Sequence, residues 1–258
     1  MARTNPSLKT PTEVAGIRAG GEILGNILAA LAELARPGIS TAELNDFAEK
    51  EIKRAGAESS FKGYGPKKNP FPAALCTSIN DVVVHGLPSR DEILEAGDII
   101  SLDLGIRYRK LYSDGAITVP VGPVTSEAQR LIATARRALD QAISVAVPGG
   151  KMGDIGYAIQ SVAENEGFGV VKDLIGHGVG FAVHEEPAVP CFGKPGTGIT
   201  LAIGMVLAIE PMITAGDWRV IGEPGTWPVV TADRRRAAHF EHTVAITPRG
   251  PEILTLPG

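Results

Sequence analysis

The chain has 258 residues, of which 44% are hydrophobic and 21% are charged, and its formal net charge is −4. These values are typical of a globular enzyme with a sizeable core, and they exclude the basic footprint of a nucleic-acid-binding protein. The sequence has no run of about 18 apolar residues that would predict a membrane-spanning helix. It also lacks the apolar segment of a secretory signal, and its two cysteines favour a reducing cytoplasm over a disulfide framework.

The first half of the chain is expected to hold two helices followed by strands. Residues 11–36 have the spacing of an amphipathic helix, with a proline near its start and Pro37 directly after it. Ser40 and Glu43 have the spacing of a capping box, which predicts a second helix over residues 41–55. The expected strands are residues 74–79, 82–86, 98–104 and 112–121.

The second half of the chain repeats this order. Residues 125–147 and 153–166 are expected to be helices, and the phrases LARPGIS (34–40) and VAVPGGK (145–151) occupy matching places in the two halves. This repetition favours an α+β fold built from two related halves whose sheet faces form a shared centre. The expected strands are residues 168–173, 181–185, 205–211 and 238–247.

The most informative polar residues are Asp103 and Asp114, which lie eleven residues apart in the pattern of an apolar β-hairpin. If the hairpin is symmetric about Tyr108 and Arg109, the two aspartates face each other across the ladder, with Cβ atoms about 5 Å apart. Carboxylates held in this way need a proton or a cation between them. The alternative is a different register in which both aspartates face water, and the hairpin pattern alone does not decide between the two.

Two glutamates lie on otherwise apolar strands in the second half. Glu210 ends an apolar run that begins at Met205, and Glu241 shares one face of its strand with His239 and Thr243. An unpaired carboxylate buried in such a strand would cost several kcal/mol. The alternative is that both glutamates cap strand ends at the surface, which is the better interpretation for a single glutamate. Two glutamates matched by two aspartates in the first half favour a site.

His177 is the fifth candidate, because the glycines around it allow the backbone to crowd the imidazole. A lone histidine is more often structural than a ligand, but His184 follows seven residues later. The four carboxylates and a neutral imidazole carry four negative charges, which two divalent cations would balance. Such oxygen-rich donors suit manganese, iron, cobalt or zinc. Carboxylates that bridge metals about 3.5–4 Å apart are typical of two-metal hydrolases.

The sequence resembles the type I methionine aminopeptidases over nearly its whole length, from KTPTEVAGIRAGG (9–21) to EHTVAIT (241–247). The intervals Asp103–Asp114, His177–Glu210 and Glu210–Glu241, of 11, 33 and 31 residues, also resemble type I, because the last leaves no room for the helical insertion of type II. The resemblance implies a "pita-bread" fold, in which antiparallel sheet encloses a dinuclear metal site and the helices lie outside. The other matching motifs are TSINDVVVHGLP (77–88), DIISLDLG (98–105), YSDGA (112–116), GHGVG (176–180), HEEP (184–187), AIEPM (208–212) and FEHT (240–243).

The resemblance implies a role for each candidate ligand. Asp103 would chelate one metal and lie near the α-amine of the substrate, Asp114 and Glu241 would bridge both metals, and His177 and Glu210 would complete the second site. A bridging water, acidified by the two cations, would attack the scissile carbonyl as hydroxide.

The resemblance further implies three catalytic residues and an apolar substrate pocket. Glu210 would take the proton of the water and pass it to the leaving amine, His184 would stabilise the oxyanion, and His85 would contact the scissile amide. The enzyme would remove the N-terminal methionine, mainly when the second residue is small. Taken singly, the aromatic residues of the pocket are more simply interpreted as core residues. The implied pocket wall is Phe61, Tyr64, Phe71, Cys76 and Trp227.

Two departures from the family pattern affect this pocket. Val183 stands where the family usually has an aromatic residue before the second histidine, and residues 63–72 form a longer segment than expected. The expected partners are the N-termini of nascent polypeptides at the ribosome, with no direct nucleic-acid or membrane binding. The chain is expected to be a cytoplasmic monomer and a single catalytic domain, 1–258, with residues 1–8 flexible.

Three rival interpretations follow from the same fold. One is an X-Pro dipeptidase-like hydrolase, although only 102 residues precede Asp103, too few for the extra N-terminal domain of prolidases. A second is a catalytically inactive binding protein of the same fold, but such relatives typically lack metal ligands and all five are present here. A third is a plain metal-binding or structural protein, which would not need His85 and His184 outside the ligand set.

Overall fold

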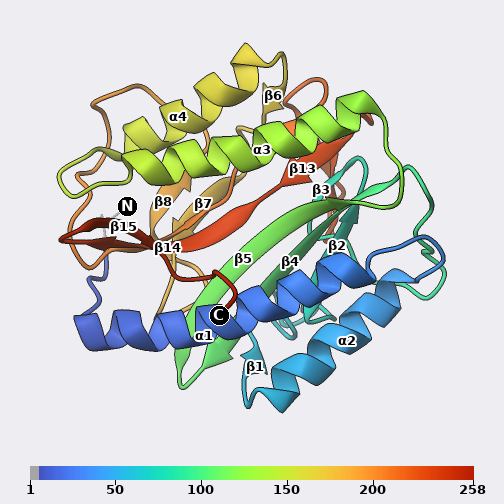
Figure 1. Cartoon of the computed structure of the whole chain (residues 1–258), viewed down its shortest axis with the longest axis horizontal. Helices are drawn as coiled ribbons and strands as arrows, with labels where there is room; N and C mark the ends of the chain where they lie inside the picture. The colour runs from blue at the N-terminus through green and yellow to red at the C-terminus, as the bar shows by residue number, and fades with distance from the viewer. Residues whose placement is uncertain (1–5) are drawn as a thin grey trace.

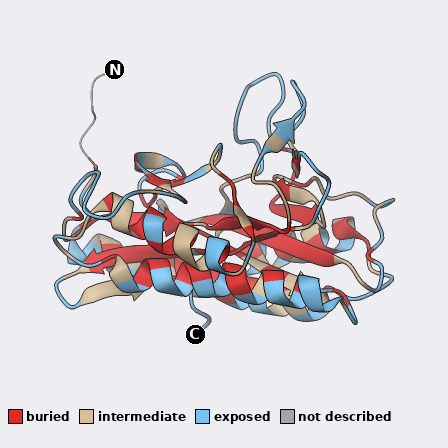
Figure 2. Cartoon of the chain, turned by 90° about the horizontal axis from the view of Figure 1, so that it is seen from above, coloured by how far each residue is buried: buried red, intermediate tan, exposed pale blue. Residues whose placement is uncertain are grey.

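A curled nine-stranded sheet forms the centre of the computed structural model, which describes residues 6–258. Four helices cover one face of this sheet, and Figure 2 shows the buried strands between this helical layer and a layer of loops. The sheet order is β1-β4-β5-β14-β9-β7-β8, with β2 paired to β4 and β15 paired to β14. The expectation that residues 1–8 are flexible concerns in part residues 1–5, which lie outside the described residues. The strands of this sheet are Glu58–Ser59 (β1), Leu75–Ile79 (β2), Ile99–Tyr108 (β4), Leu111–Pro120 (β5), Ile175–Gly178 (β7), Glu185–Pro190 (β8), Val206–Ile209 (β9), Glu241–Thr247 (β14) and Gly250–Ile253 (β15).

Both helices of the first half begin at capping boxes. In α1 (Pro11–Leu34) the backbone N–H of Thr10 donates to Glu13 Oε2 at 2.7 Å, and the N–H of Glu13 donates back to Thr10 Oγ1. In α2 (Thr41–Arg54) Ser40 and Glu43 make the same pair of hydrogen bonds, as the sequence predicted. Each box satisfies backbone donors that the first helical turn leaves free.

The second half repeats the arrangement with α3 (Ser126–Val145) and α4 (Met152–Asn165). Figure 1 shows the pair α1 and α2 and the pair α3 and α4 on the same side of the sheet, each over its own half. Each pair buries a separate hydrophobic cluster against its strands, and β5 joins the halves by pairing with β14. The predicted two-half α+β architecture is confirmed.

The register of the β4–β5 hairpin differs from the prediction by two residues. Asp103 lies opposite Ala116, and Asp114 lies opposite Gly105. The turn consists of Arg109 and Lys110, with φ of +49° and +70°, as in the two-residue turns that match the twist of a hairpin. Because a shift of two residues keeps every side chain on its face, the two aspartates share a face as diagonal rather than direct neighbours.

Several predicted strands are wrong in their extent, and the strand expected over 168–173 covers only Gly169–Val170. The strand expected at 181–185 is instead a loop over residues 181–184 that joins β7 to β8. The strand expected over 238–247 breaks at Phe240, where the chain passes from a three-stranded sheet into β14. The small sheets consist of Ala237–His239 (β13), Met212–Thr214 (β10) and Gly169–Val170 (β6), and of Val220–Gly222 (β11), Val229–Thr231 (β12) and Val82–Val84 (β3).

The strand that carries Glu210 breaks at the same level as the strand that carries Glu241. Ile209 pairs with His242, and the next pair, Met212 with His239, already belongs to the smaller sheet. Pro211 has no N–H to donate to a ladder, which favours the break. The two strands therefore separate where both glutamates lie.

Within residues 6–258, α1 is the one helix whose length and composition would allow it to cross a membrane, with a mean hydropathy of 1.3. Half of this apolar stretch is buried inside the structure, which is typical of a core helix. Gly21 and Gly25 face residues 254–257 so closely that a Cβ atom on either would overlap backbone atoms there. The glycines of α1 therefore allow this segment to cross the helix in direct contact with its backbone.

We expect Gly21→Ala to lower the free energy of unfolding by about 1–3 kcal/mol, because the added methyl group meets the fixed carbonyl of Leu254. Gly16→Ala in the same helix is the control. Its Cβ meets only the end of the Leu111 side chain, and the better helix propensity of alanine offsets that contact by up to about 1 kcal/mol. Urea unfolding of both variants tests the difference, and a Gly21→Ala protein as stable as Gly16→Ala would contradict it.

Candidate metal centre and active site

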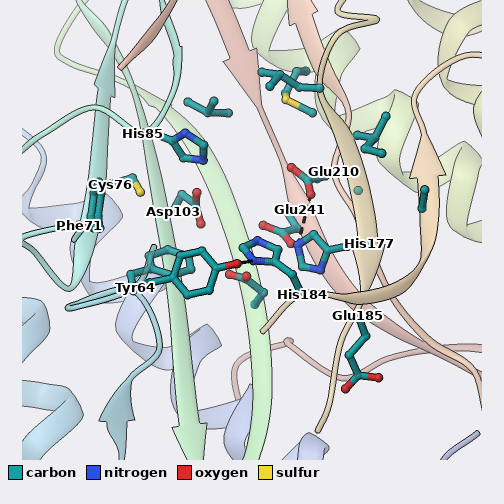
Figure 3. A pocket seen from close by; sticks show the side chains of 18 of the residues that line it. Tyr64, Phe71, Cys76, His85, Asp103, His177, His184, Glu185, Glu210 and Glu241 are labelled. Carbon is teal, nitrogen blue, oxygen red and sulfur yellow. Dashed lines mark hydrogen bonds and ion pairs between the residues drawn. The ribbon is translucent and has the colours of Figure 1, made fainter. Parts of the chain in front are cut away.

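A cavity of about 400 Å³ lies among the strands and loops of the sheet, and all of its lining residues come from these elements (Figure 3). Every residue that the sequence assigned to the site contributes to its wall, although these residues span most of the chain. They are Phe61, Tyr64, Phe71, Cys76, His85, Asp103, Asp114, His177, His184, Glu210, Trp227 and Glu241.

The expected ligands converge on one point of this cavity. Asp114, His177 and Glu241 each present a ligand atom, and these atoms all lie within 4.8 Å of one another. Asp103 and Glu241 both flank Ala116, from β4 and from β14. Glu210 Oε1 lies 3.5 Å from His177 Nε2. The sheet is therefore open at the point where the pairing of β9 with β14 stops, and the carboxylates lie at this opening.

Three of the four carboxylates are buried, so they are not the surface caps or solvated groups of the alternative interpretation. Asp103, Asp114 and Glu241 are 8%, 2% and 3% exposed. Burial raises the pKa of Asp103 to about 7, against the opposing effect of His239. The pKa values of Asp114 and Glu241 are raised well above their usual range, mainly by burial and to a smaller extent by the neighbouring carboxylates. The group is therefore electrostatically costly when it is charged and without a counterion.

The donor set fits divalent cations. Within residues 6–258, Asp103 Oδ1 and Glu241 Oε1 are buried and have no hydrogen-bond partner, which leaves their lone pairs available to a metal. His177 Nδ1 donates to the carbonyl of Gly178 at 2.9 Å, so Nε2 carries the lone pair and faces Glu210. When one ring nitrogen of a histidine binds a metal, a hydrogen bond from the other ring nitrogen typically orients the ring.

Two further histidines flank the ligand group without belonging to it. The ring of His184 lies 4.3 Å from that of His177, and its Nδ1 lies 2.6 Å from the Tyr64 hydroxyl. The pKa of His184 is lowered to about 4, mainly by burial and to a smaller extent by the nearby His177. This imidazole is therefore neutral at pH 7. Burial also lowers the pKa of His85, whose ring stands perpendicular to that of Trp227 at 6.0 Å.

The apolar end of the cavity is built from aromatic rings that contact one another edge to face. Phe71 lies 6.4 Å from Phe61 and 5.3 Å from Trp227, measured between ring centroids. Cys76 lies opposite Asp103 on the neighbouring strand, and its burial and the nearby Asp103 raise the pKa of the thiol well above its usual range. The apolar wall therefore begins directly beside the ligand group.

The long segment 63–72 is closed at its base. The N–H of Gly63 donates to the carbonyl of Phe71, and the N–H of Phe71 donates to the carbonyl of Tyr64, both at 2.8 Å. This pairing brings Tyr64 and Phe71 together at the cavity, while the additional residues extend away from it. Val183 is buried but does not line the cavity.

His239 is a site residue to which the sequence assigned no role. It is 2% exposed, and its Nε2 lies 3.6 Å from Glu210 Oε2, although it does not line the cavity. Burial lowers its pKa, but the close carboxylate of Glu210 and the charge of Asp103 outweigh this effect and raise the pKa overall. The signal in the sequence was its shared strand face with Glu241.

Known proteins match this chain in both sequence and structure. Residues 15–248 match metallopeptidase family M24. The chain is 45% identical to a methionine aminopeptidase of Clostridium acetobutylicum, over 96% of this chain and 98% of the relative, and 43% identical to methionine aminopeptidase 1 of Bacillus subtilis over the same shares. The crystal structure of a methionine aminopeptidase from Thermotoga maritima superposes with a TM-score of 0.94 at 40% identity, covering 98% of this chain and all of that one.

A more distant neighbour shares the fold. The prolidase of Pyrococcus horikoshii matches with a TM-score of 0.76 at 24% identity, and the match covers 97% of this chain but only 64% of the prolidase.

We expect the metal-free protein to lose part of its stability as the pH rises from about 4 to 7. Asp103 has a pKa of about 7 when folded and about 3.9 when unfolded, so the folded state binds the extra proton in this range and loses it above. Thermal unfolding in chelator from pH 4 to 8 measures the effect. Asp103→Asn should remove this contribution, and parallel melting curves for the variant and the wild type across the range would contradict the prediction.

Proposed function

Because this chain belongs to metallopeptidase family M24, we propose that it removes the N-terminal methionine from polypeptides, mainly where the second residue is small. The observation that carries the proposal is the junction inside one cavity between a carboxylate-rich ligand group and an apolar, aromatic pocket. A pocket directly beside the ligand group accommodates one unbranched side chain, so the scissile bond is the one that follows the first residue.

The proposed ligands of two divalent metal ions are Asp103, Asp114, His177, Glu210 and Glu241. The support for this assignment is the convergence of the donors and the buried lone pairs of Asp103 and Glu241. The donors suit cobalt, manganese, iron or zinc. Bound metal ions would supply Lewis acidity, which lowers the pKa of a water molecule toward neutrality and polarises the scissile carbonyl.

The protein's own groups would move the protons and stabilise the developing charge. Glu210 is exposed to the cavity and is positioned to accept a proton from the attacking water and to return it to the leaving amine. His184 is neutral at pH 7, and when its Nδ1 accepts from the Tyr64 hydroxyl its proton lies on Nε2. That N–H would donate to the oxyanion, and His85 would contact the scissile amide from the side of Trp227.

Substrate recognition would use the two ends of the cavity. The α-amine would lie near Asp103, while the methionine side chain would contact Phe61, Phe71 and Trp227. The raised pKa of Cys76 keeps its thiol protonated and uncharged, which suits a pocket for a thioether.

We place the enzyme in the cytoplasm, where it would act as a monomer on nascent polypeptide N-termini at the ribosome. The whole cavity is built by one chain, so a second subunit is not needed to complete it. Cys76 and Cys191 are both free and buried, which fits a reducing compartment.

We expect the purified protein to release methionine from Met-Ala-Ser when Mn²⁺ or Co²⁺ is added, because a small second residue leaves the ligand group accessible. Met-Leu-Ser is the matched control and should be cleaved much more slowly. Quantification of free methionine tests both peptides. Hydrolysis of Xaa-Pro peptides without cleavage of Met-Ala-Ser would support the X-Pro dipeptidase alternative, and inactivity with every divalent metal would support the inactive binding protein.

Variants should separate the ligands from the catalytic histidine. Asp103→Asn and Glu241→Gln should each abolish activity and lose about one metal equivalent, because each removes a carboxylate that neutralises the cations. His184→Ala should keep its metal but lose on the order of 10²–10³ in kcat, the effect of one lost oxyanion donor. Metal analysis and steady-state kinetics of the same preparations decide this, and equal metal loss in His184→Ala would show that the role assigned to His184 is wrong.

A further inference from the structure

A buried ion pair lies directly behind the loop that carries His184. The side chain of Lys9 is 1% exposed, and its Nζ lies 2.6 Å from Oε2 of Glu185, whose side chain is 11% exposed. Figure 3 shows Glu185 directed away from the other labelled side chains of the site. Glu185 lines the cavity and is the residue next to His184, but its carboxylate points away from the proposed ligands toward Lys9.

The second carboxylate oxygen of Glu185 closes the loop that precedes it. Oε1 accepts hydrogen bonds from the backbone N–H groups of Phe181 and Ala182, the latter at 2.8 Å. These residues lie in the irregular connection between β7 and β8, residues 179–184, which belongs to no strand. This carboxylate therefore restrains the connection at the two residues that precede Val183 and His184, in addition to the hydrogen bond from Tyr112 N–H to the Gly180 carbonyl.

Lys9 holds that carboxylate from a fixed position on the rest of the protein. Its backbone N–H donates to the carbonyl of Gly204 at 2.7 Å, and its Nζ also donates to Ser7 Oγ at 2.7 Å. Its stem packs against Gly180, where a Cβ atom would lie 2.6 Å from Lys9 Cε. Gly180 has a φ of +137°, which a residue with a side chain rarely adopts, so glycine allows both the turn and the contact.

We propose that Lys9 is a positioning residue for catalysis, which acts through Glu185 to hold the 181–184 loop and the imidazole of His184 toward the scissile carbonyl. This inference rests on the proposed function for its catalytic consequence, but the restraint on the loop does not depend on it. Tyr64 contacts the imidazole directly, so the pocket wall holds the ring of His184 while the ion pair holds the backbone of the loop that carries it.

Loss of the ammonium group would leave Glu185 without its cation in a site that water scarcely reaches. A largely buried carboxylate is then driven to move toward solvent, which withdraws the acceptor from the N–H groups of Phe181 and Ala182. A displacement of about 1 Å at a catalytic group can cost on the order of 10²-fold in rate. Four of the five proposed metal ligands lie on strands of the sheet and Glu210 directly follows β9, so they should keep their places.

The test is Lys9→Met, which retains the apolar stem and removes the charge. We expect kcat for Met-Ala-Ser to fall by about 10- to 100-fold with an unchanged metal content and little change in KM. Lys9→Arg, which can still pair with Glu185, should recover part of the rate. The matched control is Arg18→Met, which breaks the 2.6 Å ion pair between α1 and Glu252 of β15 and should leave kcat unchanged.

A double variant distinguishes a positioning role from general stabilisation. In a His184→Ala background, Lys9→Met should cost almost nothing further in kcat, because the group that Lys9 positions is already absent. An additional loss as large as that in the wild-type background would overturn the proposal, and so would an unchanged kcat in the single variant.

Hydrogen exchange supplies a readout that does not depend on activity. Lys9→Met, or Glu185→Gln if the first variant does not fold, should accelerate exchange of the amides of residues 181 and 182, which donate to Glu185. Exchange in α3 should not change. Faster exchange in the variant, together with no aminopeptidase activity in the wild type, would contradict the proposed function while supporting the restraint. Unchanged exchange would overturn the restraint itself.

Discussion

The structure depends on one constraint, which is that carboxylates of like charge are held together inside an apolar sheet. Asp103, Asp114 and Glu241 lie within the sheet with little access to water, and burial favours their protonated forms. A protein keeps such an arrangement only if a proton or a cation compensates for the lost hydration. The sheet supplies the rigid frame that stops the carboxylates from moving apart, because each lies on a strand paired on both sides.

The geometry that holds them arises where the two halves meet. Between Ile209 and Met212 on one strand, and between His239 and His242 on the other, the ladder of the large sheet ends and that of a smaller sheet begins. Because of this interruption, Glu210 and Glu241 are not paired with each other's strand at the break. The same opening gives the site one charged end and one apolar end, and the proposed chemistry needs both.

Much of this arrangement could be predicted from local sequence signals. Capping boxes and apolar periodicity located the helices, because these signals act within a few residues. The candidate ligands were recognisable because carboxylates on apolar strands are rare unless they are paired. The register of the hairpin could not be predicted, because it depends on which residues adopt positive φ, and Arg109 and Lys110 are not typical of such turns. The 181–184 loop depends on the contact of Glu185 with Lys9, which is remote in sequence.

The close contact of α1 with residues 254–257 has a consequence for folding. Gly21 and Gly25 lie against backbone atoms of that segment, so α1 completes its packing only when residues synthesised last among those described have arrived. Contacts between such distant parts of a chain slow folding, since a long loop must close before they form. During synthesis the side of α1 that carries Gly21 and Gly25 would therefore stay uncovered until residues 254–257 have been made, although its other apolar residues can already pack against β4 and β5.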